Sequence, residues 1–497
     1  MVAGGCRSPA PGRLEETVTL AVRGDVTGFF PNPPTMNEGY TMDVNWNLYE
    51  GLVRLDARLR IEPAVAARWE NPDERTYLFD LRPGLRFSDG RPVTAEDVVA
   101  SLLAPRAKRW VTRDYLQAVA SARALSPTRV EVKTRFPYMI LLSKLPWGHI
   151  LPAAETAKDE AAVVGTGPYR LESWSPGREF VFERNERYHG PPPAYRRARF
   201  VVVPDGRERA ERVLRGEADI ADQVPLEEIE RIQAAGHITV RSGPGIRLLI
   251  LVLRVDRRPF SDPRVREALD LAIDRGELNQ RALLGRGEPG SQLVPQSIVG
   301  FNPALLVTRP DPGRARQLLA EAGYPGGLAV RLDGPSNRYL RDVEILHELK
   351  RQLDGAGFAV TLNILDKLAY YRLLDSGQSD VGLLGWACPT GEAGDALDGL
   401  LHSKQGDILG SDNTLGLADA ELDRLIEASN SAATLEERTA LLQAAMARVA
   451  ALRPIIPLAV QPEAVAISDR VRWEPPVNYA LRIADMRPTG RPGGTRD

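Results

Sequence analysis

Residues 48–102 constrain the fold more than any other stretch, because strand, turn and helix signals follow one another within a short span. In residues 77–82, Tyr, Phe and Leu alternate with Leu, Asp and Arg, which is the period of a strand with one buried face. Pro83 and Gly84 predict a tight turn. Thr94 then stands where a helix N-cap is expected, with acidic residues in the next turn. The stretch therefore predicts a strand–turn–helix unit in a mixed α/β protein.

Similar signals continue along the chain. Pro63 is tolerated in the first turn of a helix, so we expect a helix at residues 63–69. Strands are predicted at residues 17–22, 129–133, 248–255, 328–332, 358–365, 380–386 and 455–460, and helices at 209–219, 264–274, 312–322 and 434–452. The β-α-β alternation after residue 165 predicts parallel sheet.

Length and composition exclude several classes of protein. The chain has 497 residues, which is more than one ordinary core supports, so several lobes are expected. Its net charge of −2 gives no reason to expect a nucleic-acid partner. No apolar run reaches the roughly 18 residues of a membrane span. The two cysteines, Cys6 and Cys388, lie far apart, and the five histidines show no metal-ligand spacing. We therefore predict no metal and no cofactor.

Four stretches carry a resemblance to a known family. These are L-Y-E-G-L-V at residues 48–53, a T-Y-x-F-x-L-R-x-G unit that begins at Thr76, G-T-G-P-Y at residues 165–169, and R-V-R-E-A-L-D-L-A-I-D-R at residues 264–275. Together they resemble the bacterial extracellular solute-binding proteins of family 5, the peptide- and nickel-binding receptors of ABC importers. The last motif is mostly packing, since its apolar residues form one helical face.

The resemblance implies a type II periplasmic-binding-protein fold, α/β, with two mixed-sheet lobes joined by a hinge and an inserted third lobe. Residues 17–44, 165–245 and 455–490 would form lobe I, residues 45–164 the inserted lobe II, and residues 246–454 lobe III. The tail at residues 491–497 is expected to be disordered.

The first residues resemble the end of a bacterial lipoprotein signal, in which small residues precede a lipidated cysteine. Cys6 would carry the lipid, and residues 1–16 would include a short linker. The protein is then expected in the periplasm or at the cell surface, tethered to the membrane.

The ligand is expected beyond the carboxyl end of the strand at residues 380–386, because open α/β sheets bind ligands at that edge. That strand ends in Gly385 and Trp386, which fit the family's ligand-lining G-W segment. In peptide-binding relatives, an aspartate three residues after the tryptophan pairs with the peptide ammonium. Pro389 occupies that position here, so either Glu392 or Asp395 replaces the aspartate, or the protein binds no free amine. Asp395 also fits the N-cap of a helix toward Leu401.

Further candidates flank this segment. Arg254 stands where relatives commonly carry asparagine, and its fork of donors would suit an anionic group or pair with a nearby acid. Cys388 lies in the same loop. It is either a candidate for lining the ligand site or a small apolar residue that fills space in the core. Tyr40, with Trp46 and Tyr49, would line the facing wall.

We expect a monomeric, non-enzymatic receptor that captures a peptide or peptide-like solute between its lobes and delivers it to a membrane permease. One alternative is a receptor of the same family for an anionic or sugar-like solute. Another is a hydrolase that uses Glu392 and Asp395, although no hydrolase or nucleotide-binding motif occurs. The scattered histidines disfavour a nickel receptor.

Overall fold

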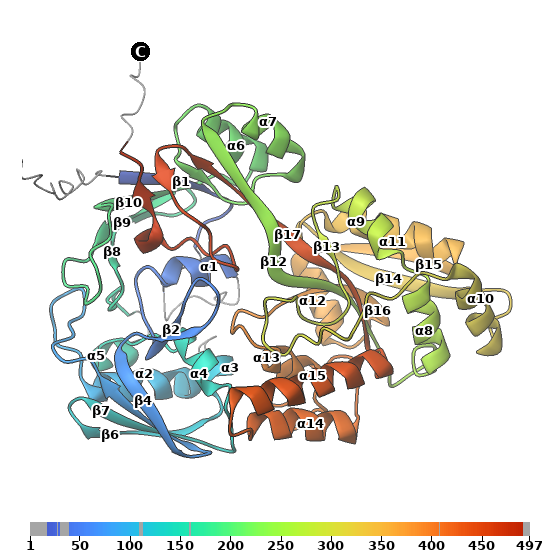
Figure 1. Cartoon of the computed structure of the whole chain (residues 1–497), viewed down its shortest axis with the longest axis horizontal. Helices are drawn as coiled ribbons and strands as arrows, with labels where there is room; N and C mark the ends of the chain where they lie inside the picture. The colour runs from blue at the N-terminus through green and yellow to red at the C-terminus, as the bar shows by residue number, and fades with distance from the viewer. Residues whose placement is uncertain are drawn as a thin grey trace, which may run out of the picture.

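The computed structural model describes residues 17–26, 28–29, 39–108, 113–158, 161–406 and 408–490. Among these residues, the largest sheet has 11 strands, with the path β15-β14-β16-β12-β17-β11-β1-β10-β9-β8 and β13 beside β17. The sheet is mixed: β1 lies parallel to β10 and β11, whereas β12, β16 and β17 are antiparallel neighbours. Figure 1 shows that it extends from the first lobe, at the top, into the third lobe, on the right. The predicted mixed α/β architecture is confirmed.

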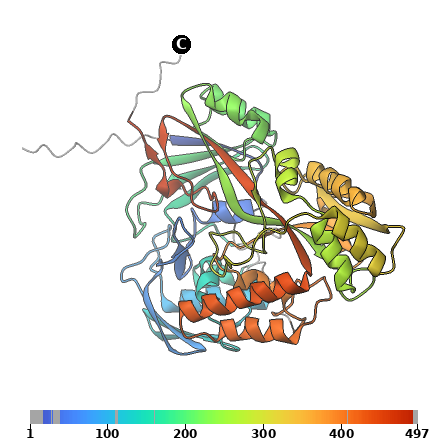
Figure 2. The same cartoon turned by 45° about the vertical axis from the view of Figure 1, so that its right-hand side comes forward.

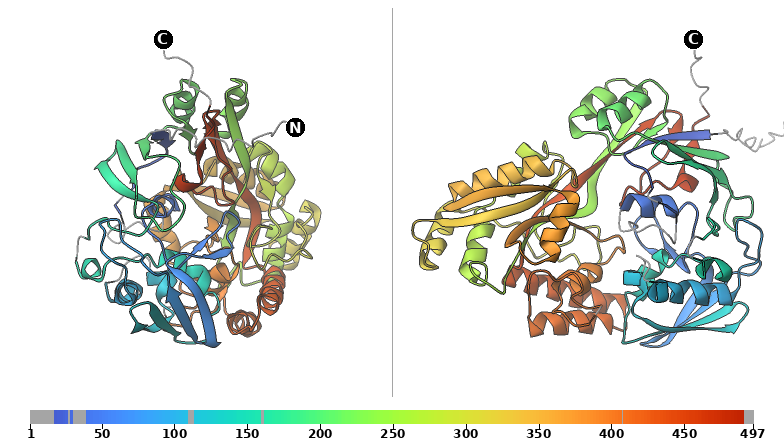
Figure 3. Two further views of the ribbon diagram at one scale, coloured as in Figure 1. Left: turned by 60° about the vertical axis from the view of Figure 1, so that its left-hand side comes forward. Right: turned by 180° about the vertical axis from the view of Figure 1, so that it is seen from behind.

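Two long antiparallel strands join the first and third lobes. They are β12 (Ile238–Leu253) and β17 (Ile455–Ser468), and both cross the whole gap between the lobes in Figures 1 and 3. Their pairing is irregular between Pro244 and Leu248, where the strands leave one lobe and enter the other. The interruption removes ladder hydrogen bonds and bends the strand pair. The lobe boundaries given above remain a proposal, because both strands belong to two lobes.

The first lobe packs an apolar core on its end of the sheet. Its elements are β1 (Thr17–Val22), α1 (Gly39–Asn45), β8 (Tyr169–Ser175), β9 (Glu179–Arg184), β10 (Arg197–Val202), α6 (Gly206–Leu214), β11 (Ile220–Ala221) and α7 (Ile229–Gln233). Phe180, Phe182 and Phe200 alternate inward from β9 and β10 and are fully buried. The predicted strand at residues 17–22 is confirmed.

The second lobe has its own four-stranded antiparallel sheet in the order β4-β5-β7-β6, covered by α2 (Ala95–Lys108). Its strands are β4 (Ala66–Asp73), β5 (Thr76–Leu81), β6 (Val119–Ser126) and β7 (Arg129–Thr134), with the short pair β2 (Val53–Leu55) and β3 (Ile61–Pro63) and the short helices α3 (Arg113–Leu116), α4 (Leu141–Lys144) and α5 (Ala153–Thr156). The helix predicted at residues 63–69 is wrong. Trp69 instead lies opposite Phe79 in the β4–β5 ladder, and strand pairing outweighed the local signal of Pro63.

The third lobe is doubly wound. Parallel β14 (Leu328–Ser336) and β15 (Phe358–Asp366) are joined by α11 (Asp342–Gly355), and β16 (Val381–Ala387) follows α12 (Lys367–Asp375). Its other elements are α8 (Pro263–Leu271), α9 (Arg275–Ala282), β13 (Glu288–Pro289), α10 (Pro312–Glu321), α13 (Gly394–Ala396), the π-helical turn at Leu397–Leu401, α14 (Ala420–Asn430) and α15 (Leu435–Leu452). The long helices α14 and α15 lie beneath the sheet and reach toward the second lobe in Figures 1 and 2.

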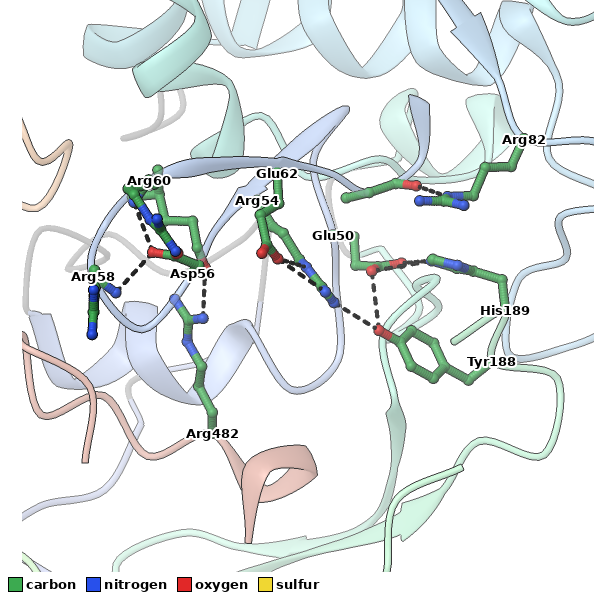
Figure 4. A network of polar contacts seen from close by, with 12 residues as sticks. Glu50, Arg54, Asp56, Arg58, Arg60, Glu62, Arg82, Tyr188, His189 and Arg482 are labelled. Carbon is green, nitrogen blue, oxygen red and sulfur yellow. Dashed lines mark hydrogen bonds and ion pairs between the residues drawn. The ribbon is translucent and has the colours of Figure 1, made fainter. Parts of the chain in front are cut away.

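The first and second lobes are fixed to each other by a polar network, drawn in Figure 4. Glu50, which is buried, accepts from His189 at 2.9 Å and from the Tyr188 hydroxyl at 3.4 Å. Arg54 contacts the same Tyr188 hydroxyl at 3.4 Å and pairs with Glu62. Arg482 donates to the carbonyl of Leu55 at 2.6 Å. These contacts connect the first lobe to the second, while β12 and β17 connect the first lobe to the third.

Among the described residues, no helix has both the length and the apolar composition that a membrane crossing requires.

Candidate functional site

The three lobes enclose a cavity of about 820 Å³. The first lobe contributes Arg23, Asp25, Tyr40, Asp222, Gln461 and Glu463; the second contributes Trp46, Tyr115, Lys144 and Trp147; the third contributes Arg247, the loop at residues 337–341, Trp386, Asp395 and Asp398. This volume lies within the range of pockets that hold small molecules. A solute bound here would contact every lobe.

The carboxyl end of β16 forms the wall on the third lobe, as the sequence predicted for a ligand edge. Trp386 lies opposite Leu248 in the β12–β16 ladder, and its ring is only partly buried against the core. Gly385 lies against Tyr339 and Arg247. A Cβ at Gly385 would come within 2.6 Å of the Tyr339 ring and 3.1 Å of Arg247. Glycine is therefore needed here for two lining side chains to approach the strand.

Aromatic rings form the opposite wall. Tyr115 stacks on Trp147 with ring centroids 4.9 Å apart, and Trp46 packs on Trp147 at 5.4 Å. The indole Nε1 atoms of Trp46, Trp147 and Trp386 are buried, and no described residue accepts a hydrogen bond from them. Unsatisfied buried donors are rare in native proteins. Three such donors around one cavity fit a solute that supplies acceptor oxygens.

Two arginines of the cavity lining, Arg247 and Arg338, act on each other. Arg247 donates to the carbonyl of Gly385 at 3.1 Å and lies 5.9 Å from the Tyr339 ring centroid, but it forms no ion pair with a carboxylate of the described residues. Burial lowers the pKa of the Arg247 guanidinium, and the charge of Arg338 lowers it further. Arg338 donates to the Tyr371 hydroxyl at 3.0 Å. An anion between the two arginines would relieve their repulsion.

A second group of lining side chains is acidic, and this part of the lining is called the acidic end of the cavity. Asp395, in α13, and Asp398, in the π-helical turn, line the cavity. Burial raises the pKa of both carboxyls, and the ammonium of Lys144 opposes that rise. The Lys144 Nζ lies 3.4 Å from Asp395 Oδ1. The cavity lining thus includes arginines, aspartates beside Lys144 and aromatic rings, with further carboxylates at Asp25, Asp222 and Glu463.

Of the residues predicted from sequence, Trp386, Gly385, Asp395 and Tyr40 line this cavity, as does Trp46. Tyr40 belongs to α1, and the Arg23 guanidinium lies 5.4 Å above its ring. Tyr49 instead stacks on His149 in the core, with ring centroids 5.5 Å apart. Cys6 lies outside the described residues.

Three predicted residues lie outside the cavity lining. Glu392 is buried and pairs with Arg438 at 2.7 Å, and it also accepts from Ser143. Cys388 is 1% exposed in the core, and burial raises the pKa of its thiol. Arg254 pairs with Asp256 at 2.7 Å and donates to the carbonyl of Thr414. Of the alternatives left open for Arg254, the structure therefore shows the pairing with a nearby acid.

The N-cap interpretation of Asp395 is wrong. The N-cap of α13 is Ala393, and Asp395 lies inside the helix with its carboxylate toward Lys144. The spacing of the sequence suggested a helix that begins after Asp395. The helix begins earlier, at Gly394, and continues after Ala396 as a π-helical turn.

Several lining residues escaped the sequence analysis, namely Arg247, Arg338, Tyr339, Lys144 and Trp147. Arg247 carried a usable signal, because it directly precedes the apolar run at residues 248–253 on a strand predicted to be buried. A charge at that boundary indicates a strand end at a cavity. Lys144 carried no such signal, because only the tertiary fold brings it to Asp395.

The fold and the cavity between the lobes are those of solute-binding proteins of the type II class. Residues 60–407 match the family profile "Bacterial extracellular solute-binding proteins, family 5 Middle". The chain belongs to this family, whose members are the solute receptors of ABC importers.

Individual relatives agree with this assignment. The glutathione-binding protein GsiB of Escherichia coli K12 is 28% identical over 490 residues, which cover 95% of this chain and 94% of that protein. The periplasmic binding protein DppA from Helicobacter pylori, in complex with the peptide STSA, superposes with a TM-score of 0.83 at 22% identity over 96% of this chain and 98% of that one. NikA from Brucella suis, in complex with Fe(III)-EDTA, gives 0.84 at 22% identity over 96% and 100%. These two structures support the fold.

Proposed function

We propose that this receptor captures a peptide-like solute, with a carboxylate of the solute between Arg247 and Arg338 and its central part between the rings of Trp386 and Trp147. The observation that carries this proposal is Arg247, a largely desolvated guanidinium at the cavity wall with no carboxylate of the described residues paired to it. A guanidinium binds carboxylates bidentately, and the pair is strengthened where water is excluded.

Glutathione is the solute that the GsiB relatives are named for binding. Glutathione carries two carboxylates and two amide carbonyls. Oxygen atoms of these groups would accept from the three indole donors at Trp46, Trp147 and Trp386. We therefore propose short peptides with an extra carboxylate, glutathione among them, as the first solutes to test.

A second candidate is an anionic solute that is not a peptide. It is supported by Pro389, which stands where peptide-binding relatives of this family carry the aspartate that pairs with the peptide ammonium. AgaA from A. tumefaciens R10, in complex with agropinic acid, shares the fold with a TM-score of 0.82 at 23% identity over 95% of this chain and 98% of that one. Both candidates place an anionic group at Arg247.

The proposed function requires no chemical step. Glu392 is held by Arg438 and Ser143 outside the cavity, so it does not form a pair of free carboxylates with Asp395. Among the described residues, no three His, Cys, Asp or Glu side chains are grouped to hold a metal ion. The proposed cycle consists of binding, closure of the lobes and delivery to a permease. In this proposal the receptor acts as a monomer, either in the periplasm or at the membrane surface, where a lipid at Cys6 would anchor it.

The test is calorimetric titration of the solute-free protein with glutathione and a panel of di- and tripeptides. Arg247→Gln should weaken binding of any solute that wild type binds by about 30-fold or more, since truncating one partner of a desolvated charge pair costs about 2–5 kcal/mol. Arg254→Gln is the matched control, because Arg254 follows the same strand but is paired with Asp256 away from the cavity. Equal affinity of the Arg247→Gln and Arg254→Gln proteins would contradict the proposed anion site.

A further inference from the structure

The acidic end of the cavity contains two carboxylates that are costly to bury. Asp398 is 2% exposed, and its Oδ1 accepts from Asn430 at 3.0 Å, whereas its Oδ2 has no hydrogen-bond partner among the described residues. Asp395 lies one helical turn away and faces the same space. Buried carboxylates require a cation or a set of donors nearby. The identity of that cation determines what this end of the cavity accepts.

The chain itself provides a cation here. Lys144, at the end of α4 in the second lobe, reaches across to the third lobe and pairs with Asp395 at 3.4 Å. Its side chain is 8% exposed, and its Nζ lies 5.5 Å from the Tyr138 ring centroid. Burial alone would lower the pKa of Lys144, but Tyr138, Asp395 and Asp398 stabilise the ammonium and raise the pKa above its usual value. The lysine is thus charged and desolvated at the cavity wall.

Lys144 is held in this position by its neighbours. The preceding residue, Ser143, donates to Glu392, which is itself paired with Arg438. The amide of Met139 donates to the carbonyl of Asn430 at 3.0 Å. These contacts join α4 to the region around α13 and α14, and they place the Lys144 ammonium reproducibly rather than leaving it to sample solvent.

We propose that Lys144 takes the place of the solute ammonium, so that the receptor selects solutes with no free amine at this end. This inference rests on the proposed function and specifies the solute class: N-acylated peptides, or anionic peptide-like molecules whose amine is blocked or absent. A second ammonium would meet the like charge of Lys144 and compete with it for Asp395. The opposing possibility is a solute ammonium bound to Oδ2 of Asp398, which has no partner in the described part of the chain. Comparison of free and blocked amines separates the two.

The experiment measures how tightly the wild-type protein binds two matched pools of tripeptides. One pool has free N-termini and the other is N-acetylated, and the pools include glutathione and N-acetylglutathione, respectively. Bound molecules are separated by ultrafiltration and quantified by mass spectrometry. We expect the acetylated form of each bound peptide to bind about tenfold or more tightly than the free form, because a free ammonium meets the like charge of Lys144. Equal binding of the two forms, or a preference for the free amine, would overturn the inference while leaving the proposed function intact. If neither pool binds, the proposed function fails, and the inference fails with it.

A substitution makes the test sharper. Lys144→Met should create a preference for the free amine of about tenfold or more, because Asp395 then lacks its cation and a solute ammonium can supply it. The matched control is Lys158→Met, which removes a lysine of the same lobe that is 52% exposed and pairs with Glu155 at 2.9 Å outside the cavity. An unchanged ratio of free to acetylated affinity in Lys144→Met would also overturn the inference. If Lys144→Met does not fold, the wild-type comparison decides alone.

Discussion

Replacing Trp386 with alanine tests whether this side chain contributes to solute binding or to the stability of the core. The indole lines the cavity, its ring is only partly buried against the core, and its Nε1 has no hydrogen-bond acceptor among the residues that the structure describes. A tryptophan buries about 150–250 Å² when fully covered, which is worth about 4–6 kcal/mol at about 25 cal/mol per Å². If the solute covers roughly half of the ring, Trp386→Ala should cost about 2–3 kcal/mol of binding, or roughly 30- to 150-fold in Kd.

The solute-free protein should be affected much less. A fully buried tryptophan costs about 3–5 kcal/mol when it is truncated to alanine, whereas the exposed part of Trp386 has no core contacts to lose. We therefore expect the free energy of unfolding of the solute-free protein to fall by at most about 2 kcal/mol. Binding is measured by calorimetric titration with the tightest solute of the panel, and stability by urea unfolding.

Trp69→Ala is the matched control, because Trp69 is a partly buried tryptophan that packs on the core of the second lobe and does not line the cavity. It should lower stability with no change in affinity. The reasoning is refuted if Trp386→Ala binds as wild type does, or if it unfolds as readily as a protein that has lost a core tryptophan.

Two further predictions concern residues outside the cavity. Burial lowers the pKa of His149 from 6.5 to about 3, so its contribution to stability is complete above pH 6.5 and is lost as the pH falls toward 3. Between pH 7 and pH 4, wild type should therefore lose roughly 1–3 kcal/mol more stability in urea unfolding than His149→Phe; equal losses would mean that His149 is protonated in the folded state. Glu392→Gln removes the carboxylate paired with Arg438, which is 1% exposed, so it should cost about 3–5 kcal/mol of stability and leave the affinity of the folded protein within about threefold. Lost affinity with intact stability would show that Glu392 binds the solute.

The sequence predicted the elements whose signals are local and repeated. Strand 77–82 alternates cleanly, and it is present as β5 at Thr76–Leu81. Thr434 was expected to begin a long helix, and its hydroxyl accepts from the amide of Glu437 at the start of α15. In these places side-chain periodicity and capping act over a few residues, so the tertiary fold has little to add.

The prediction failed where pairing with distant residues decides the local structure. Residues 63–69 are extended because Trp69 lies opposite Phe79 in a ladder, although Pro63 is compatible with a helix start. Glu392 and Asp395 looked alike as loop carboxylates. In the structure, Glu392 pairs with Arg438, which is 46 residues away along the chain, and Asp395 pairs with Lys144, which is 251 residues away. No local sequence pattern distinguishes these two partners.

The central claim is that the lobes hold a small solute and release it unchanged. The most direct measurement is native mass spectrometry of the protein purified gently from its own host, followed by identification of the released molecule. The account predicts one bound solute per chain, anionic and small enough for a cavity of about 820 Å³, and recovered unaltered after repeated binding and release. A released molecule that is cleaved or otherwise modified on return to the protein, or a bound species with no anionic group, would contradict it.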